Sequence, residues 1–465
     1  MKQIEDPNGL VFTCSDGDSA AQFAAITSAY MGFRRDTGAR VNTLLEADPD
    51  MPMARCAQGY FAKLMGSANH SARACAISTE LDHHIGQLDA TDRERAHAAA
   101  LSAWTRGQME TATALWEEIL LDHPTDGLAL RLSHFTHFYS GDGRRMRDSL
   151  AHLLPRWSED HPNYGFLLGM YAFGLEESRD YARAEKYGRR AVDLNPADAW
   201  SVHSVAHVLE MTERHEDGIA WVKGLERDWS TVNNFRFHLH WHRCLYHLER
   251  GEFEEVLAIY DAQVVSDIAS DFYLDICNAS SLLWRLEMFG VDVGDRWREL
   301  ADVAKTHVGD TDLIFVSLHY LMALVSAGDA DAADEMIANI RTWSTLDDTQ
   351  AGICARVGLT LAEGLRDARA GNHAGAVSKI GAVRYQMDEI GGSAAQRDVF
   401  HMILADAAAA GANAQKARAL FAERVGHKVH SSWSWHGYSN ALAALGDIAG
   451  AQDAEARSAA IRALN

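Results

Sequence analysis

The chain has 465 residues, of which 47% are hydrophobic and 23% are charged, and only seven are proline. This length exceeds the roughly 250–300 residues at which one hydrophobic core stops growing, so we expect either several domains or an elongated repeat. The net charge of −22 disfavours nucleic acid and anionic membrane surfaces as partners. The composition also excludes a disordered chain, and the longest apolar runs are too short to span a membrane.

Residues 1–18 are predicted to form a capping arm ahead of one continuous solenoid over residues 19–465. The opening residues, MKQIEDPNGL, lack the basic start and the apolar stretch of a secretory signal, so we expect a cytoplasmic protein. The six cysteines are scattered and form no C-x-x-C pair, which is typical of packing residues in a reducing compartment. No linker rich in proline, glycine or serine divides the chain, and this favours a single domain.

Apolar residues recur at i, i+3, i+4 and i+7 along the chain, which predicts an all-α fold. Residues 107–124 place a turn glycine, Ala112, Trp116 and a closing proline where two helices of a hairpin would cross. The same offsets recur at 179–196. Further turns of this kind, about 35 to 43 residues apart or near twice that, are expected at Gly251, Gly328, Gly371, Gly411 and Gly446. We therefore predict a superhelical α-solenoid of tetratricopeptide-like helical hairpins.

Residues 198–213, DAWSVHSVAHVLEMTE, are predicted to form the first helix of one hairpin, with Asp198 as its N-cap. His203, His207 and Glu210 lie at i, i+4 and i+7 and therefore share one helix face, separate from the apolar face. The first helices of such hairpins line the concave groove. We expect the His/His/Glu face to point into it.

The first helix of the next hairpin, FRFHLHWHRCLYHLERG, brings His238, Trp241 and His242 next to that face. With a third imidazole from this helix, His203, His207 and Glu210 form a ligand set suited to zinc or non-haem iron.

Two alternatives to a metal site remain open. In the first, His203 or His207 acts as an acid or base in a metal-free pocket, and in the second the histidines are a structural, hydrogen-bonded stripe. Ser204 stands where H-E-x-x-H metalloproteases carry glutamate, so protease chemistry is disfavoured.

Two further segments contribute candidate binding residues. At the start of another first helix, GGSAAQRDVF places Gln396, Arg397 and Asp398, with His401 one turn on. Arg397 could grip a substrate carboxylate, whereas a helix capped by Ser393 with a local Arg–Asp pair is the alternative. In the segment before residue 179, Tyr171 is expected to help roof an enclosed pocket.

Six strings carry a resemblance to a known family: DPNGLVFTCS (6–15), HPTDGLAL (123–130), DAWSVHSVAHVLEM (198–211), RGEFEEVLAIYD (250–261), SSLLWRLEMFGVDVGDRW (280–297) and GGSAAQRDVF (391–400). With these strings the chain resembles the tetratricopeptide repeat protein 38 family over essentially its whole length. The resemblance implies the solenoid fold and marks the Gln-Arg-Asp string as characteristic. It implies no particular reaction.

Two functions follow from these residues. The first is an enclosed His/Glu-lined pocket for a small polar metabolite, with hydrolytic or deaminating chemistry, either metal-dependent or acid–base. Its expected catalytic residues are His203, His207, Glu210 and His242, and its expected binding residues are Tyr171, His238, Trp241, Gln396, Arg397, Asp398 and His401. The alternative is an adaptor that binds a protein or peptide in its concave groove. The acidic surface and the tryptophan-rich C-terminal end permit a homodimer.

Overall fold

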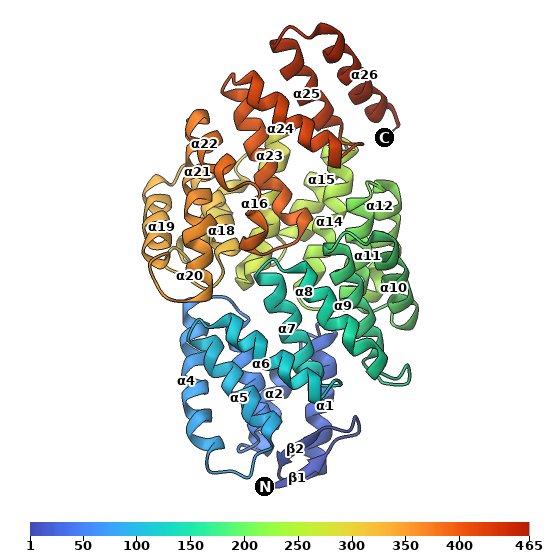
Figure 1. The fold of residues 1–465 in the computed structure, drawn as a ribbon, viewed down its shortest axis with the longest axis vertical. Helices are drawn as coiled ribbons and strands as arrows, with labels where there is room; N and C mark the ends of the chain where they lie inside the picture. Colours follow the sequence, from blue (N-terminus) through green and yellow to red (C-terminus); the bar gives the residue numbers. More distant parts are fainter. Residues whose placement is uncertain (465) are drawn as a thin grey trace.

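The computed structural model describes residues 1–464, and most of them lie in helices (Figure 1). The chain opens with an antiparallel hairpin of β1 (Lys2–Glu5) and β2 (Val11–Cys14), in which Ile4 lies opposite Phe12. Helix α1 begins at Gly17, where the Asp16 side chain accepts hydrogen bonds from the next turn. The arm predicted over residues 1–18 thus consists of this hairpin and the first residues of α1.

The helices then follow one another with short connections. The first part contains α1 (Gly17–Met31), α2 (Thr37–Ala47), α3 (Pro52–Lys63), α4 (Ala68–Ile85), α5 (Asp92–Thr105), α6 (Met109–Asp122), α7 (Gly127–Tyr139), α8 (Gly143–Leu153) and the short turn η1 (Leu154–Arg156). The middle part contains α9 (Tyr164–Glu177), α10 (Tyr181–Leu194), α11 (Ala199–Met211), α12 (His215–Gly224), α13 (Glu226–Trp229), α14 (Phe235–Glu249), α15 (Phe253–Ile259), and the turns η2 (Tyr260–Val264) and η3 (Ile268–Ser270). The last part contains α16 (Tyr273–Met288), α17 (Arg296–Lys305), α18 (Ile314–Ala327), α19 (Ala330–Trp343), α20 (Thr349–Ile353), η4 (Cys354–Gly358), α21 (Leu359–Arg369), α22 (His373–Val383), η5 (Met387–Ile390), α23 (Ala394–Ala410), α24 (Ala414–His427), α25 (Ser432–Ala444) and α26 (Ile448–Leu464).

Neighbouring helices pack as antiparallel hairpins, and the sequence signals mark their turns. Left-handed backbone conformations occur at the predicted turn positions Gly107, Arg179, Gly251, Gly328, Gly371 and Gly446. At the remaining predicted turn the left-handed residue is Ala412, one position after the glycine. Such a residue ends one helix and turns the chain into the next. The chain is an all-α superhelical solenoid of tetratricopeptide-like hairpins, as predicted.

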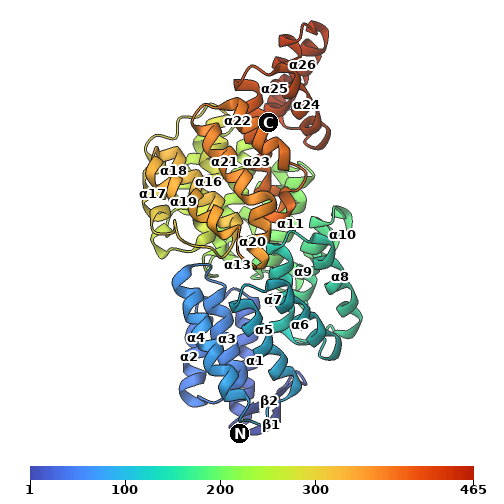
Figure 2. The same cartoon turned by 60° about the vertical axis from the view of Figure 1, so that its left-hand side comes forward.

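The superhelix closes on itself near its middle. Helix α20 lies beside α6, and the Thr349 amide donates to the Gly107 carbonyl at 3.0 Å. The Lys63 ammonium and the Ser71 hydroxyl both bind the Asp312 carboxylate, which joins α3 and α4 to the segment before α18. Figures 1 and 2 show the blue N-terminal helices meeting the orange helices in this way, whereas α24 to α26 project at the far end.

The buried apolar residues form two large groups that meet at α14. One group runs from Leu10 to Tyr246 and the other from Trp241 to Ala441. Within residues 1–464, no helix is both long and apolar enough to cross a membrane.

Candidate functional site

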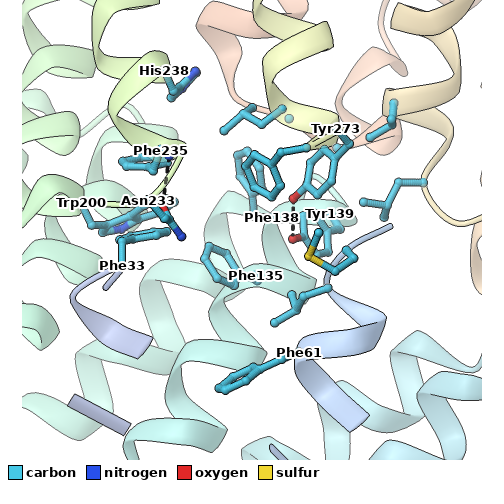
Figure 3. Close-up of a pocket in the computed structure, with 18 of the residues that line it drawn as sticks. Phe33, Phe61, Phe135, Phe138, Tyr139, Trp200, Asn233, Phe235, His238 and Tyr273 are labelled. Carbon is cyan, nitrogen blue, oxygen red and sulfur yellow. Dashed lines mark hydrogen bonds between the residues drawn. The ribbon is translucent and has the colours of Figure 1, made fainter. Parts of the chain in front are cut away.

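A cavity of about 320 Å³ lies where the closed superhelix brings its two halves together (Figure 3). Aromatic rings make up most of its walls, and they come from helices far apart in the sequence. The lining includes Tyr30, Phe33, Phe61, Phe135, Phe138, Tyr139, Trp200, Phe235, Phe272, Tyr273 and Phe315. The polar groups facing it include His203, His238, Asn233 and Gln396, and the exposed Arg34 and Arg35 stand at its rim. This lining is more apolar than the His/Glu-lined pocket expected from the sequence.

One wall of the cavity is a stack of rings around a buried cation. The rings of Phe33 and Phe235 are 4.5 Å apart and nearly parallel. The Arg131 guanidinium lies 4.5 Å from the Phe33 ring centroid and 4.6 Å from that of Trp200. Burial lowers the pKa of Arg131 to about 10. Cation–π attraction to several faces offsets part of the cost of burying this charge.

Phe33 has a left-handed backbone, with φ of 54°, which is unusual for an aromatic residue. Its carbonyl accepts a hydrogen bond from the Asn233 amide at 2.8 Å. Contacts made 200 residues away therefore hold this strained turn, and strain of this kind is often found at functional sites.

In the opposite wall of the cavity, two glycines pack tightly against neighbouring residues. The Tyr139 and Tyr273 hydroxyls are 3.1 Å apart (Figure 3). At Gly392, a Cβ atom would lie 2.4 Å from the Phe315 ring, and at Gly391 it would lie 2.6 Å from the Tyr139 carbonyl oxygen. Both glycines have positive φ. Only glycine fits here, which explains the GG pair in GGSAAQRDVF.

Four histidines lie close together, two from α11 and two from α14, and one of each pair, His203 and His238, lines the cavity. His203, His207, His238 and His242, here called the histidine cluster, each offer a nitrogen within 4.8 Å of the others. All four residues are at most 3% exposed. On each helix the two histidines are spaced i, i+4 and therefore share one face, and the two faces meet where α11 packs against α14. The sequence analysis had named all four.

The nitrogens of the histidine cluster have few hydrogen-bond partners. His238 Nδ1 donates to the Asn278 side-chain oxygen at 2.7 Å, and His238 Nε2 lies 3.1 Å from His203 Nε2. Among the residues that the structure describes, both nitrogens of His207 and of His242 lack hydrogen bonds. Burial lowers the pKa of His238 to about 4 and the pKa values of the other three well below their usual range. The four rings are therefore neutral at pH 7.

The carboxyl group beside this cluster, Glu176, was not among the residues predicted from the sequence. Glu176 Oε2 lies 3.5 Å from His207 Nδ1 and is buried. Burial and the adjacent Glu177 raise the pKa of Glu176 well above its usual range. Glu176 ends α9 at the repeat position that Glu210 occupies in α11, so reading both repeats in one register would have found it.

Glu210 itself binds elsewhere. Its carboxylate accepts a hydrogen bond from the Lys428 ammonium at 2.8 Å. Although burial opposes the shift, Lys428 holds the pKa of Glu210 below its usual range. Glu210 is not among the groups that converge with the histidines. The predicted set of His203, His207 and Glu210 is therefore not brought together around one point.

Of three other predicted binding residues, one lines the cavity, one supports the histidine cluster and one does neither. Trp241 stacks on the His238 ring at 5.0 Å, and its indole N–H donates to Ser281, so it supports the cluster from behind. Gln396 lines the cavity and completes a capping box with Ser393. His401 is partly buried and does not line the cavity.

Three residues predicted to bind a ligand instead contact other side chains of the protein: Arg397, Asp398 and Tyr171. The Arg397 guanidinium is 3.1 Å from Asp388 and 3.5 Å from Glu177, so internal carboxylates already occupy it. Asp398 binds Arg424 through both oxygens. Tyr171 lies on the far face of α9, where its hydroxyl accepts from Arg183, and Phe173 instead contacts the His203 and His207 rings. These partners lie far along the chain or on another face, so local spacing could not reveal them.

No family model matches this chain. Among solved structures, the human IFIT1 dimer with PPP-AAAA is 12% identical, with a TM-score of 0.40, over 96% of this chain and 95% of that chain. The human IFIT1 dimer with m7Gppp-AAAA is 11% identical, with a TM-score of 0.39, over 88% of this chain and 89% of that chain. Naa15/Naa10 bound to HypK-THB is 10% identical, with a TM-score of 0.24, over 96% of this chain and 64% of that chain. Likeness at this level transfers none of those ligands or partners to this chain.

Proposed function

We propose that this protein binds a small organic molecule with a flat, mostly apolar body inside the aromatic cavity. The observation that carries the proposal is the cavity itself, about 320 Å³ in volume and walled by aromatic rings from α1 to α18. Ligand pockets are typically concave, mostly apolar, of about 300–1,000 Å³, and furnished with a few polar groups. Native cores otherwise leave few voids larger than a water molecule.

The polar groups indicate how such a ligand would lie. His203 and His238 stand at one wall, with Asn233 nearby, and Gln396 is contributed by α23. A ligand with a hydrogen-bonding group at one end would satisfy Nδ1 of His203, which lacks a partner among the described residues, while its apolar body would stack on the Phe33, Phe235 and Trp200 rings. The metabolite expected from the sequence was polar; an aromatic or otherwise apolar body suits this lining better.

A reaction on that ligand remains a prediction. Because Glu210 is bound to Lys428, and Arg397 to Glu177 and Asp388, an acid–base or hydrolytic step would fall to His203, which lines the cavity, with His207 and His242 behind it. Glu176 is the carboxyl group next to these rings.

A fluorescent dye, 8-anilinonaphthalene-1-sulfonate, tests the cavity in the folded protein. Leu274 lines the cavity, so Leu274→Trp should fill it and reduce dye binding by more than about tenfold without changing the melting temperature by more than a few degrees. Leu194→Trp, at an exposed position, is the matched control. Equal dye binding by both variants would contradict the proposal, and mass spectrometry of extracts from the purified protein would then look for a bound metabolite.

The adaptor function is a second candidate because one end of the solenoid exposes apolar side chains. Val429, Leu445 and Ile448 are 46%, 36% and 57% exposed around α25 and α26. A Leu445→Asp/Ile448→Asp variant should weaken self-association or partner binding if this end is an interface, which light scattering would detect. An unchanged molar mass would remove the homodimer at this surface.

We further infer membership of the tetratricopeptide repeat protein 38 family from the six quoted strings. Two of them, DAWSVHSVAHVLEM and GGSAAQRDVF, contain His203, His207 and Gln396, which belong to the site. The cytoplasmic location and the absence of nucleic-acid partners stay predictions from the N-terminal sequence and the net charge of −22.

A further inference from the structure

The histidine cluster presents four nitrogen ligands to one point. Its members come as two i, i+4 pairs on helices that pack against each other, α11 and α14, and their ligand atoms all lie within 4.8 Å of one another. Two nitrogens bound to one tetrahedral ion at about 2.0–2.1 Å lie roughly 3.3 Å apart. The His203 and His238 Nε2 atoms, 3.1 Å apart, are already close to that separation.

The cluster is incomplete as a hydrogen-bonded network. The two nitrogens of His207, the two nitrogens of His242 and Nδ1 of His203 lack hydrogen-bond partners among the described residues. Leaving buried polar groups unpaired costs folding free energy, so native proteins rarely retain several together. A ligand held by these nitrogens would remove that cost.

For two rings of the cluster, an oxygen outside the cluster lies beside one ring nitrogen, and only the contact to His238 is a hydrogen bond. The Asn278 side-chain oxygen holds His238 Nδ1 at 2.7 Å, which leaves Nε2 facing the cluster. The Glu176 carboxyl group lies 3.5 Å from His207 Nδ1. Metal-ligating histidines almost always place their other ring nitrogen against a carboxylate or carbonyl oxygen in this way.

We propose that His203, His207, His238 and His242 together bind one divalent transition-metal ion, with Zn²⁺ as the ion to test, and that Glu210 is not a ligand. Imidazole ligands favour late first-row ions, whereas Mg²⁺ and Ca²⁺ favour oxygen. Closing four rings on one ion requires side-chain shifts on the order of an ångström. His203 and His238 also line the cavity, so the ion would face its interior. The site stands independently of any organic ligand.

The test uses the full-length, untagged protein, freed of metal with a chelator and then dialysed against Zn²⁺ or Mg²⁺. Elemental analysis should find one zinc per chain and no retained magnesium. A His203→Leu/His207→Leu variant should bind Zn²⁺ more than about 100-fold more weakly, because losing two ligands exceeds the effect of losing an outer contact. His430→Leu/His436→Leu, which removes two exposed histidines, is the matched control and should bind like the unmodified protein.

Two further measurements do not depend on that variant folding. X-ray absorption at the zinc edge of the unmodified protein should count four nitrogen neighbours with imidazole scattering. Glu210→Gln should retain the zinc and the same spectrum, because the amide can still accept from Lys428 and no ligand is lost. Zinc bound by oxygen-rich ligands, zinc retained in the His203→Leu/His207→Leu variant, or much less than one zinc per chain in the unmodified protein would each overturn the proposal. Dye binding to the metal-free protein reports on the cavity separately.

Discussion

Two of the buried regions that contain histidine differ in how their ring nitrogens are satisfied. In the first, the Asp126 network, Asp126 accepts a hydrogen bond from Arg93 at 2.6 Å and lies 3.1 Å from His97 Nε2, while His97 Nδ1 is 3.3 Å from the Tyr60 hydroxyl. In the histidine cluster, by contrast, both nitrogens of His207 and of His242 lack hydrogen-bond partners among the described residues.

The comparison separates a structural use of histidine from a binding use. The Asp126 network joins β2, α5 and α7, since Arg93 also donates to the Val11 carbonyl and Asp126 caps α7. Its polar groups are satisfied within the chain, so it needs no ligand. The histidine cluster has the same residue type and the same burial without such partners, which is the physical basis for assigning it to binding.

The largest effect is expected from breaking the satisfied network. Asp126→Ala should lower the free energy of unfolding by about 3–5 kcal/mol, because Arg93 would be left buried without its counter-charge and α7 would lose its cap. Urea denaturation followed by circular dichroism would measure it. A loss below about 1 kcal/mol would mean that water replaces the carboxylate and that the network is not structural.

Two buried carboxyl groups, one in the Asp126 network and one outside both regions, should give opposite pH dependences. Although burial opposes the shift, His97 and Arg93 hold the pKa of Asp126 below its usual range, so its contribution to stability is lost only as the pH falls. The Asp275 carboxyl group, on α16, accepts a hydrogen bond from the Asn234 side chain at 2.7 Å, and burial raises its pKa to about 8. Its contribution is greatest below the unfolded-state pKa of about 4 and is lost as the pH rises to 8.

The Asp275→Asn variant removes the pH dependence of stability that Asp275 contributes. Relative to the variant, the unmodified protein should lose up to about 1.4 kcal/mol of unfolding free energy per pH unit between pH 6 and 8. Denaturation of both proteins at three pH values in that range measures the difference. Parallel curves would show that Asp275 is already ionised in the folded protein.

One substitution made in both regions tests the comparison directly. His97→Leu should cost about 1–3 kcal/mol of unfolding free energy, because Asp126 and Tyr60 lose a buried partner. In metal-free protein His207→Leu should stay within about 1 kcal/mol of the unmodified protein, because an apolar side chain of similar size replaces a ring with no hydrogen bonds. Equal losses of unfolding free energy in the two variants, measured in parallel melts, would contradict the distinction between the structural and the binding use of histidine.

The smallest effect is expected at an exposed histidine. His436 binds Glu455 at 2.8 Å with 53% of its side chain exposed, and solvent weakens such a pair. His436→Ala should change the free energy of unfolding by less than about 0.5 kcal/mol. A larger loss would indicate that α25 and α26 depend on this contact for their packing.

Local periodicity was sufficient for the parts of the fold and site that lie within one or two helices. The i, i+4 spacing of His203 with His207 and of His238 with His242 predicts two stripes on neighbouring helices, and the structure joins them. Asp198 is the N-cap expected for α11, with its carboxylate accepting from the Trp200 amide. These features depend on the α-helical repeat alone.

Contacts between distant parts of the chain could not be predicted from local periodicity. Glu210 and Lys428 are separated by 218 positions, and nothing near Glu210 signals that a lysine will neutralise it. The aromatic cavity likewise arises only because the superhelix closes, since the Phe33 turn must meet Asn233 and Tyr139 must meet Tyr273. Sequence spacing describes each helix face but not the curvature that decides which faces meet.

The walls of the cavity span the chain from Tyr30 to Gln396. In most solenoids each repeat contacts only its neighbours, so evolution can add, delete or exchange repeats one at a time. Here the deletion of one hairpin between α2 and α22 would move the two halves out of register and open the pocket. Only the hairpins after α23 are free of this constraint, so we expect natural variation in repeat number to be confined to the C-terminal end.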